Sequence, residues 1–327
     1  MNISSRDIMM PVVPMFHVNA WGTPYAAAMV GASLVLPGPG LDGSSLVNLI
    51  DDYHVNLALG VPTIWQGLLL AAEQLGSSLT TLQRNVVGGS ACPPSMIEVF
   101  KNKYQCETLH AWGMTETSPL GTANQLKAKH HDLNDQEKLK RRLSQGRPPF
   151  GVDVRLVDQE QGTQEIVRDG ESVGYLQIKG HWIVDQYFKA EQSALTEDGW
   201  FDTGDIATLD QDGYLTLKDR AKDLIKSGGE WISSVELENI AIAHPEVAMA
   251  AVIAAKHEKW DERPILIAVK HENTTLDSQQ LLDFYQDKVA KWQIPDQVIF
   301  VDKIPISGTG KMLKKDLREQ YGNILLS

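Results

Sequence analysis

The chain of 327 residues is acidic, with 42 Asp and Glu residues against 30 Lys and Arg residues and a formal net charge of -12. This balance argues against a nucleic-acid partner, although it is compatible with a polyanionic ligand held by a few local cations. With 43% hydrophobic residues, the chain has enough apolar material for the buried cores of about two domains.

The first part of the chain alternates between strand-like and helix-like runs. Strands are predicted at 8–16, 33–36, 56–61, 84–87 and near 107–111, and helices at about 21–30, after Asp42, at 62–74 and after the Pro93-Pro94 pair. Alternation of this kind predicts a mainly parallel sheet covered by helices. Open sheets of this class bind ligands at the carboxyl ends of their strands, where the runs 88–93 and 112–119 are expected to lie.

Residues 127–142 are polar and charged and have a helical pattern, so we expect them on the surface. The run His130-His131-Asp132 lacks a third ligand at helical spacing, which favours a solvated helix over a metal site. From 152 to 218 the pattern changes to short alternating strands separated by DG, EDG and QDG turns, which predicts a small β subdomain. The DQDG run at 210–213 fits a hairpin turn better than a calcium loop.

The last hundred or so residues have the pattern of a separate α+β unit. Ser233 and Glu236 form a capping box that opens a helix to Ala243. Strands are predicted at 247–255, 264–270 and 298–301, and helices at 278–290 and after Lys311. The domain boundary is predicted at the turn 219–222.

Cellular context is indicated only indirectly. Cys92 and Cys106 fit neither a metal spacing nor a disulfide framework, so a reducing cytoplasm is the expected location. The longest apolar stretch, around 26–36, is too short to span a bilayer, and any membrane contact is expected to be peripheral. A homodimer is left open.

The stretch 202–236 combines several unusual features. Asp205 stands at the mouth of one predicted strand and Arg220 at the end of the next, and two adjacent glycines follow at 228 and 229. A carboxylate can accept two hydroxyl hydrogens from a vicinal diol, and a nearby guanidinium can pair with a phosphate. This combination predicts a binding site for a nucleotide ribose.

The same stretch contains WFDTGD (200–205) and GYLTLKDRAKDLIKSGGEWISSVELE (213–238). Four more motifs follow the same family pattern: PMFHVNAW (14–21), GGSACP (88–93), WGMTETSP (112–119) and SGTGK (307–311). Together they resemble the adenylate-forming, or AMP-binding, superfamily over almost the whole chain, and they are most similar to medium- and long-chain fatty acyl-CoA synthetases.

The resemblance implies an α/β fold in three parts. Residues 1–150 would be the C-terminal part of the large AMP-binding domain, with a mainly parallel but incomplete sheet. Residues 151–219 would form a β-barrel-like subdomain, and 220–327 a small, mobile α+β domain that rotates about Lys222.

The implied chemistry has two steps: a fatty-acid carboxylate attacks the α-phosphate of ATP to give an acyl-adenylate, and the thiol of CoA then attacks the acyl carbon. Both steps gather negative charge, so lysines, arginines, backbone donors and Mg²⁺ are expected at the site. The implied ligands are a fatty acid, ATP, Mg²⁺ and CoA, and the implied role is a ligase of fatty acid and lipid metabolism.

Site residues are carried over motif by motif. The resemblance implies catalytic roles for Lys311, Thr115 and Glu116, with Glu116 also the magnesium ligand. It implies nucleotide binding by Gly89, Ser90, Ala91, Trp112, Gly113, Asp205 and Arg220, CoA binding by Lys226, Gly228, Gly229 and Trp231, and an acyl pocket that includes His17 and Trp21.

Plainer interpretations stand beside these. Trp112 would otherwise be an ordinary packed tryptophan at a strand end, His17 and Trp21 would be core residues, and Lys311 would be a solvated lysine. SGTGK is not a Walker motif, because Pro305 stands where the first glycine is needed and Met312 where serine or threonine is needed.

One family motif has no counterpart: nothing in residues 1–16 resembles the phosphate-binding loop of the form TSGTTGxPKG. The first residues resemble an interior linker, so we expect a truncated enzyme with impaired activity. A catalytically inactive remnant that binds nucleotide or CoA, or forms a subunit contact, is the alternative. GGEWIS and FHVNAW argue against an aryl-CoA ligase or a luciferase-like oxygenase.

Overall fold

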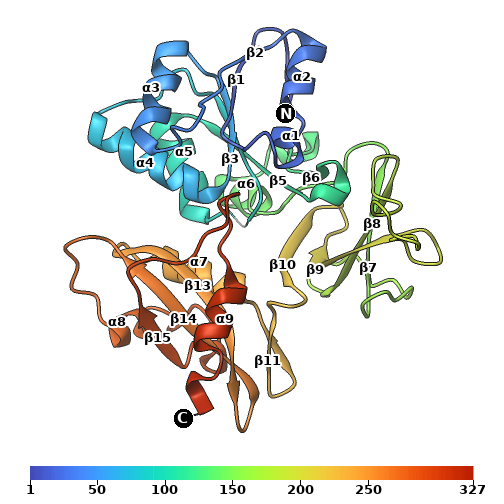
Figure 1. Cartoon of the computed structure of the whole chain (residues 1–327), viewed down its shortest axis with the longest axis vertical. Helices are drawn as coiled ribbons and strands as arrows, with labels where there is room; N and C mark the ends of the chain where they lie inside the picture. Colours follow the sequence, from blue (N-terminus) through green and yellow to red (C-terminus); the bar gives the residue numbers. More distant parts are fainter. Residues whose placement is uncertain (91, 327) are drawn as a thin grey trace. The chain divides into compact units, whose positions relative to one another are not determined.

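The computed structural model describes residues 1–90 and 92–326, and the chain divides into two compact units (Figure 1). The large unit comprises Met1–Thr203 with Ala207–Leu217, and the small unit comprises Gly204–Ile206 with Lys218–Ser327. The final division along the chain falls between Leu217 and Lys218, next to the turn 219–222 at which the sequence predicts a boundary.

The large unit contains a six-stranded sheet in the order β2-β1-β3-β4-β5-β6. Strands β1 to β5 are parallel to their neighbours, and β6 is antiparallel to β5. The mainly parallel sheet predicted from the alternating pattern is therefore confirmed. The strand bounds are β1 Ile8–Pro11, β2 Ser33–Leu34, β3 Leu57–Gly60, β4 Arg84–Val87, β5 Glu107–Gly113 and β6 Leu120–Ala123.

The two faces of this sheet belong to different clusters because side chains alternate along a strand. Met10, Ala58 and Val87 pack with the helices α3 (Gly43–Tyr53), α4 (Pro62–Leu75) and α5 (Pro94–Tyr104). The opposite-facing Met9, Leu57 and Val86 pack with Ala27 of α2 (Thr23–Val30). Figure 1 shows α3, α4 and α5 in blue and teal beside the sheet.

Two predictions near the start of the chain are wrong in their bounds. The strand predicted at 8–16 ends at Pro11, and the helix predicted from Trp21 begins only at Thr23. Between them lies the short turn α1 (Val18–Trp21), in which all four residues have positive φ of 47° to 57°. The left-handed region costs L-residues roughly 1–2 kcal/mol each, so neither propensity nor periodicity could have indicated this turn.

The predicted β subdomain is a four-stranded sheet in the order β10-β9-β8-β7. Its core contains Val154, Leu176, Ile178, Ala207 and Leu215. The DQDG run is a turn, as predicted, in which the Asp210 carboxylate accepts the backbone N–H groups of two later residues. The strand bounds are β7 Val152–Val157, β8 Gly174–Gly180, β9 Phe201–Leu209 and β10 Leu215–Arg220.

The segment 127–142 is only partly the solvated helix that was predicted. Its second half is the helix α6 (Asp135–Arg142), whose N-terminus is capped by Asn134. Its first half contains the 3-10 helix η2 (Ala128–His130), and His130 is buried, with Nε2 3.1 Å from an Asp212 oxygen and Nδ1 3.3 Å from the Tyr214 hydroxyl. His130 thus fastens this segment to the DQDG turn, a contact between residues about eighty positions apart.

The small unit is a five-stranded sheet in the order β12-β11-β14-β13, with β15 paired to β14. One face packs on α7 and α8 through Val252 and Leu266, and the other packs on α9 through Ile253 and Ile265. The strands are β11 Ile225–Ser227, β12 Glu230–Ile232, β13 Val247–His257, β14 Asp261–Lys270 and β15 Gln297–Phe300. The helices are α7 Ser234–Ile242, α8 Ser278–Asp283, η3 Lys291–Gln293, α9 Lys314–Tyr321 and η4 Ile324–Leu326.

One of the two hydrogen bonds of the predicted capping box of α7 is confirmed: the Ser233 hydroxyl accepts the backbone N–H of Glu236. The helix predicted at 278–290 is too long, since α8 ends at Asp283 and turns follow it. Within the described part of the chain, no helix is long and apolar enough to cross a membrane. Both cysteines are buried and unbridged.

Candidate functional site

The turn after β4 contains glycines and places its backbone close to side chains of neighbouring elements. Gly89 has φ of 81°, a value that glycine adopts without strain, and Ser90 beside it is exposed. The buried ring of His110 in β5 makes hydrogen bonds with the Leu143 carbonyl, at 3.1 Å, and with the backbone of Ser90. Burial lowers the pKa of His110 to about 4, so the ring is neutral at pH 7. Ala91, also predicted in this site, lies outside the described residues.

Trp112 lies in β5 and is 7% exposed. Its ring packs against Gly121, where an added Cβ would lie 2.3 Å from the indole, and belongs to the core of the β7–β10 sheet. One side of this tryptophan is therefore occupied by the protein itself, as expected of a packed strand-end residue. Stacking of Trp112 on an adenine stays a prediction.

The 3-10 helix η1 (Thr115–Thr117) follows β5 through a tight turn. A Cβ on Gly113 would lie 1.8 Å from the Pro119 carbonyl oxygen, so this position requires glycine. The buried Thr117 hydroxyl accepts the Met114 N–H at 2.9 Å and fixes the same turn. Thr115 is exposed, and Glu116 is half-buried.

Glu116 is held by a segment that the sequence did not single out. Its carboxylate Oε1 accepts the Tyr187 hydroxyl at 2.9 Å, and its backbone carbonyl accepts the Val184 N–H at 2.8 Å. Partial burial and the Glu116 charge raise the pKa of Tyr187. Tyr187 is thus a missed neighbour of the predicted magnesium ligand. Among the described residues, no three His, Cys, Asp or Glu side chains gather with metal-binding geometry.

The predicted acyl-pocket residues lie in and beside the left-handed turn α1. The indole of Trp21 covers Gly88, where an added Cβ would be 3.1 Å from the ring. Trp21 also packs with the cluster that contains Leu59 and Leu109. The structure therefore brings the FHVNAW and GGSACP motifs into contact within the large unit, while His17 stands half-buried just before the turn.

In the small unit, Asp205 of β9 and Arg220 of β10 are brought together. Asp205 Oδ1 lies 3.7 Å from Arg220 Nε, and the side chains are 12% and 51% exposed, respectively. The backbone N–H of Ala221 donates to the Gly204 carbonyl and holds the two strand ends side by side. A mostly buried carboxylate therefore stands beside an arginine whose side chain is about half exposed to solvent.

The predicted CoA-binding residues form the hairpin of β11 and β12. Gly228 and Gly229 have φ of 60° and 91°, and a Cβ on Gly228 would lie 2.7 Å from the Trp260 ring. The Lys226 ammonium lies 5.0 Å from the centre of the Trp231 ring, and both side chains are exposed. The exposed Lys222 lies in the turn just before this hairpin.

Lys311 lies at the end of a tight turn before α9. Its backbone N–H donates to the Ser307 hydroxyl at 3.1 Å, and its carbonyl accepts the Ser307 N–H at 2.8 Å. Gly310, with φ of 79°, allows the chain to reverse there. The turn thus presents a half-buried lysine from a short, hydrogen-bonded loop.

The predicted site residues divide between the units: Glu116, Thr115, Trp112, Gly113, Gly89, Ser90, His17 and Trp21 belong to the large unit, and Asp205, Arg220, Lys222, Lys226, Gly228, Gly229, Trp231 and Lys311 belong to the small unit. Sequence reasoning missed His110 and Tyr187. Neither stands at a spacing from its partner that a sequence pattern would reveal.

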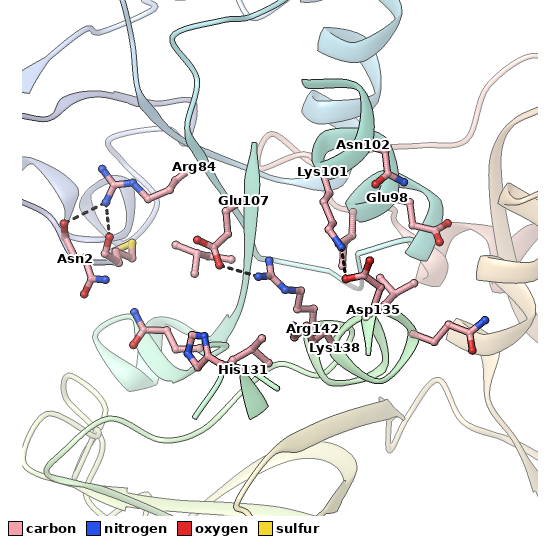
Figure 2. Close-up of a pocket in the computed structure, with 17 residues that line it drawn as sticks. Asn2, Arg84, Glu98, Lys101, Asn102, Glu107, His131, Asp135, Lys138 and Arg142 are labelled. Carbon is pink, nitrogen blue, oxygen red and sulfur yellow. Dashed lines mark hydrogen bonds and ion pairs between the residues drawn. The ribbon is translucent and has the colours of Figure 1, made fainter. Parts of the chain in front are cut away.

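A hollow of about 680 Å³ in the large unit lies elsewhere (Figure 2). It is lined by charged side chains that pair with one another, such as Arg142 with Glu107 and Lys101 with Asp135, each at 3.1 Å. None of the described site residues predicted from the sequence lines it. We assign it no role.

Comparisons with known proteins agree with the geometry. Residues 1–188 match the model of the AMP-binding enzyme family, and 236–311 match that of the AMP-binding enzyme C-terminal domain. The chain is 60% identical to a medium-chain-fatty-acid–CoA ligase of Ectopseudomonas oleovorans over 100% of its own length, and 59% identical to a 3-methylmercaptopropionyl-CoA ligase of Ruegeria pomeroyi over 98%. In both cases it spans 59% of the relative.

Among solved structures, ATP-bound MatB from Rhodopseudomonas palustris superposes with a TM-score of 0.83 at 26% identity, covering 98% of this chain and 61% of that one. The α/β fold expected from the motifs is therefore confirmed. Because the family model matches more than half of the residues, and the motifs occupy the strand ends and turns described above, the chain belongs to the AMP-binding enzyme family of adenylate-forming proteins.

Proposed function

We propose that this chain carries the adenylate- and CoA-binding parts of a fatty acid–CoA ligase, which activates an aliphatic carboxylic acid with ATP and transfers the acyl group to CoA. The family and the names of the relatives support this reaction class. The observation that carries the proposal is the pairing of buried Asp205 with half-exposed Arg220. A diol and an adjacent phosphate are the groups that such a pair can bind together.

In this proposal the Asp205 carboxylate accepts the ribose hydroxyls, and Arg220 pairs with the phosphate. The 3.7 Å separation between Asp205 and Arg220 is longer than a hydrogen bond, so the arginine can turn to a ligand at little cost. Gly89 and Ser90 would offer backbone groups to the base. Trp112 would contribute an edge of its indole, since Gly121 covers part of the ring.

Glu116 fits a magnesium ion held mainly by phosphates. Mg²⁺ is commonly bound by one or two carboxylates together with substrate phosphates and water, and one oxygen of Glu116 remains available beside the one that Tyr187 occupies. When bound, the ion would neutralise phosphate charge. Thr115, exposed next to Glu116, would offer its hydroxyl to the same phosphates.

For the small unit we propose that Lys311 supplies the cation for adenylate formation and that the hairpin of Lys226, Gly228, Gly229 and Trp231 receives CoA. A rotation about Lys222 would exchange the two, because conformational steps of this kind assemble different constellations in turn. A cytoplasmic location, a homodimer and peripheral membrane contact stay predictions.

The acyl group is proposed to be aliphatic. Trp21, one of the two residues proposed for the acyl pocket with His17, packs its indole over Gly88. The names of both relatives given above refer to aliphatic acids, one of which contains sulfur.

A rival function is binding without turnover. The proposed contacts to adenylate and CoA, Asp205 with Arg220 and the hairpin of Lys226, lie within this chain, which spans 59% of its relatives, so binding can be tested on the chain by itself. The two candidates share adenylate binding and differ in turnover. ATP-pyrophosphate exchange with a series of fatty acids distinguishes them.

Calorimetric titration with AMP tests the shared part. Asp205→Ala should weaken binding by roughly 30- to 150-fold, the effect of losing about 2–3 kcal/mol of hydrogen bonding to a charged group. Asp153→Ala is the matched control, because Asp153 is an exposed aspartate on β7 of the same sheet. Equal affinities for the wild type and Asp205→Ala would remove Asp205 from the site.

A further inference from the structure

Three charged side chains are buried together in the small unit, although they come from distant parts of the sequence. Asp219 ends β10, Glu238 lies in α7, and Lys314 is the first residue of α9. Asp219 is 5% exposed, and the side chains of Glu238 and Lys314 are 8% and 12% exposed. The proposed chemistry uses none of them.

The three charges are joined through Ser234. The Lys314 ammonium lies 2.6 Å from Glu238 Oε1 and donates to the Ser234 hydroxyl at 2.6 Å. The backbone N–H of Ser234 donates to Asp219 Oδ2, also at 2.6 Å. Asp219 Oδ1 accepts the N–H of Arg220 at 2.8 Å. One continuous path of contacts therefore runs from the start of α9 to the end of β10.

The same helix has a second tie, one turn further on. Arg318 of α9 pairs with Asp223, with 2.5 Å between the guanidinium and the carboxylate. Asp219 and Asp223 lie on either side of Lys222, which is exposed. Helix α9 is thus fastened to the chain both before and after Lys222, within the small unit and just past the division between Leu217 and Lys218.

Stability alone does not account for such a cluster. Buried ion pairs add little net stability compared with apolar residues of similar size, and their best-attested use is to fix one arrangement among several. Burial alone would lower the pKa of Lys314, but Glu238 and Asp219 raise it instead, so the ammonium stays charged. The cluster therefore holds a permanent cation at the junction of three elements.

Lys314 is also three residues beyond Lys311. The intervening Leu313 donates its N–H to the Pro305 carbonyl at 2.9 Å, and the bridge between Ile306 and Met312 closes the turn. The Lys311 turn therefore has little freedom of its own once Lys314 is fixed. Any displacement of α9 would carry Lys311 with it.

We propose that Lys314 is a positioning residue: by joining Ser234, Glu238 and, through Ser234, Asp219, it ties the Lys311 turn to the end of β10. The proposal rests on the role proposed above for Lys311. Because Asp219 precedes Lys222 and the other members of the cluster follow it, rotation about Lys222 would have to break the contact between Ser234 and Asp219.

Hydrogen–deuterium exchange of the full chain tests the coupling without any ligand. Lys314→Met should raise exchange about tenfold at two separated places, the amides of 219–223 with Ser234 and the amides of 307–313, because one charged contact holds both. Lys315→Met is the matched control: Lys315 is the next residue of α9, 81% exposed, and pairs only loosely with Glu319 at 3.8 Å. It should exchange like the wild type.

A functional readout separates positioning from general damage. Mass spectrometry can follow acetylation of Lys311 by acetic anhydride with and without a non-hydrolysable acyl-adenylate analogue. In the wild type the bound analogue should protect Lys311. In Lys314→Met the analogue should still bind within about threefold of wild-type affinity, as measured by calorimetry, but protection of Lys311 should be lost, because the affinity rests chiefly on Asp205 and Arg220.

Should Lys314→Met fail to fold, the double variant Lys314→Met with Glu238→Gln removes the uncompensated carboxylate and serves in its place. Faster exchange confined to α9, or unchanged protection of Lys311, overturns the coupling. If the wild type binds no adenylate analogue, the proposed function fails, while the exchange experiment still decides whether the two segments are joined.

Discussion

The two units hold their predicted functional turns in different ways. In the large unit, the turn that carries Glu116 is fixed by contacts without charge: Gly113 lies against the Pro119 carbonyl, and the Thr117 hydroxyl bonds to backbone. Nearby, His110 is buried as a neutral ring. Fit and backbone hydrogen bonds decide the geometry there.

In the small unit, helix α9, which directly follows the Lys311 turn, is held by buried charges. Lys314, Glu238 and Asp219 lie between α9, α7 and β10, and Arg318 with Asp223 adds a second ion pair. A turn that depends on close packing should be destabilised when a methyl group is added. A turn that depends on an ion pair should be destabilised when one of the two charged side chains is removed. The two turns are therefore expected to fail on different kinds of substitution.

The largest effect is expected from Glu238→Leu, which leaves the Lys314 ammonium without its nearest partner. Removing one member of a buried pair costs roughly 3–5 kcal/mol. Adding Lys314→Met to the same chain should recover most of this loss. Guanidinium unfolding, followed by hydrogen exchange in peptides of β13 and β14, measures both. If the double variant is no more stable than Glu238→Leu alone, the loss of stability does not come from leaving Lys314 unpaired.

Gly113→Ala should destabilise the large unit by about 3 kcal/mol, because the new methyl group meets backbone, which cannot move away easily. Gly67→Ala is the matched control, since a Cβ at Gly67 of α4 has no atom within 4 Å. That change should instead stabilise by roughly 0.5–1 kcal/mol through helix propensity. If the two variants unfold at the same denaturant concentration, the close approach at Gly113 is wrong.

The units should respond to pH in opposite directions between pH 6.5 and 4. The folded-state pKa of His110 is lowered from 6.5 to about 4, so the unfolded chain binds the proton first and the large unit loses stability as pH falls, by about 2 kcal/mol at pH 5. Burial raises the pKa of Glu238 and of Asp219, so folding of the small unit becomes more favourable as their carboxylates take up protons.

Exchange-monitored unfolding at pH 7 and pH 5 measures this contrast. His110→Gln should abolish the pH dependence of the large unit over this range and leave that of the small unit unchanged. A wild-type large unit equally stable at both pH values would contradict a neutral buried His110.

The smallest effect concerns the surface of α2. Tyr25 and Met29 are 61% and 86% exposed and lie four residues apart, which places them on one face of the helix. We expect the chain to associate through apolar surface of this kind. Replacing both with serine should reduce light scattering with less than about 0.5 kcal/mol change in stability. Tyr53→Ser on α3 is the control, and an equal reduction in scattering there would remove the α2 face from consideration.

Much of the fold could be predicted because its elements are local and periodic. The helix predicted at 62–74 is found as Pro62–Leu75, and the strand at 84–87 as Arg84–Val87. The motifs supplied the order of the elements and the family. Positions after strand ends followed from the general geometry of parallel sheets.

What could not be predicted depends on contacts between distant residues or on backbone strain. The left-handed turn at Val18–Trp21 contradicts the preferences of its residues. His130 with Asp212 and Glu238 with Lys314 are separated by about eighty positions, and no periodicity links them. Tyr187 reaches Glu116 from a segment without regular structure.

The most direct test of the account is whether the wild-type chain binds an acyl-adenylate. Calorimetric titration with a non-hydrolysable octanoyl-adenylate analogue should give one site per chain, at least about tenfold tighter than AMP, because burial of several methylene groups adds to the contacts of Asp205 and Arg220. Asp205→Ala should weaken both ligands by the same factor. No measurable binding of either ligand to a folded wild-type chain would contradict the account.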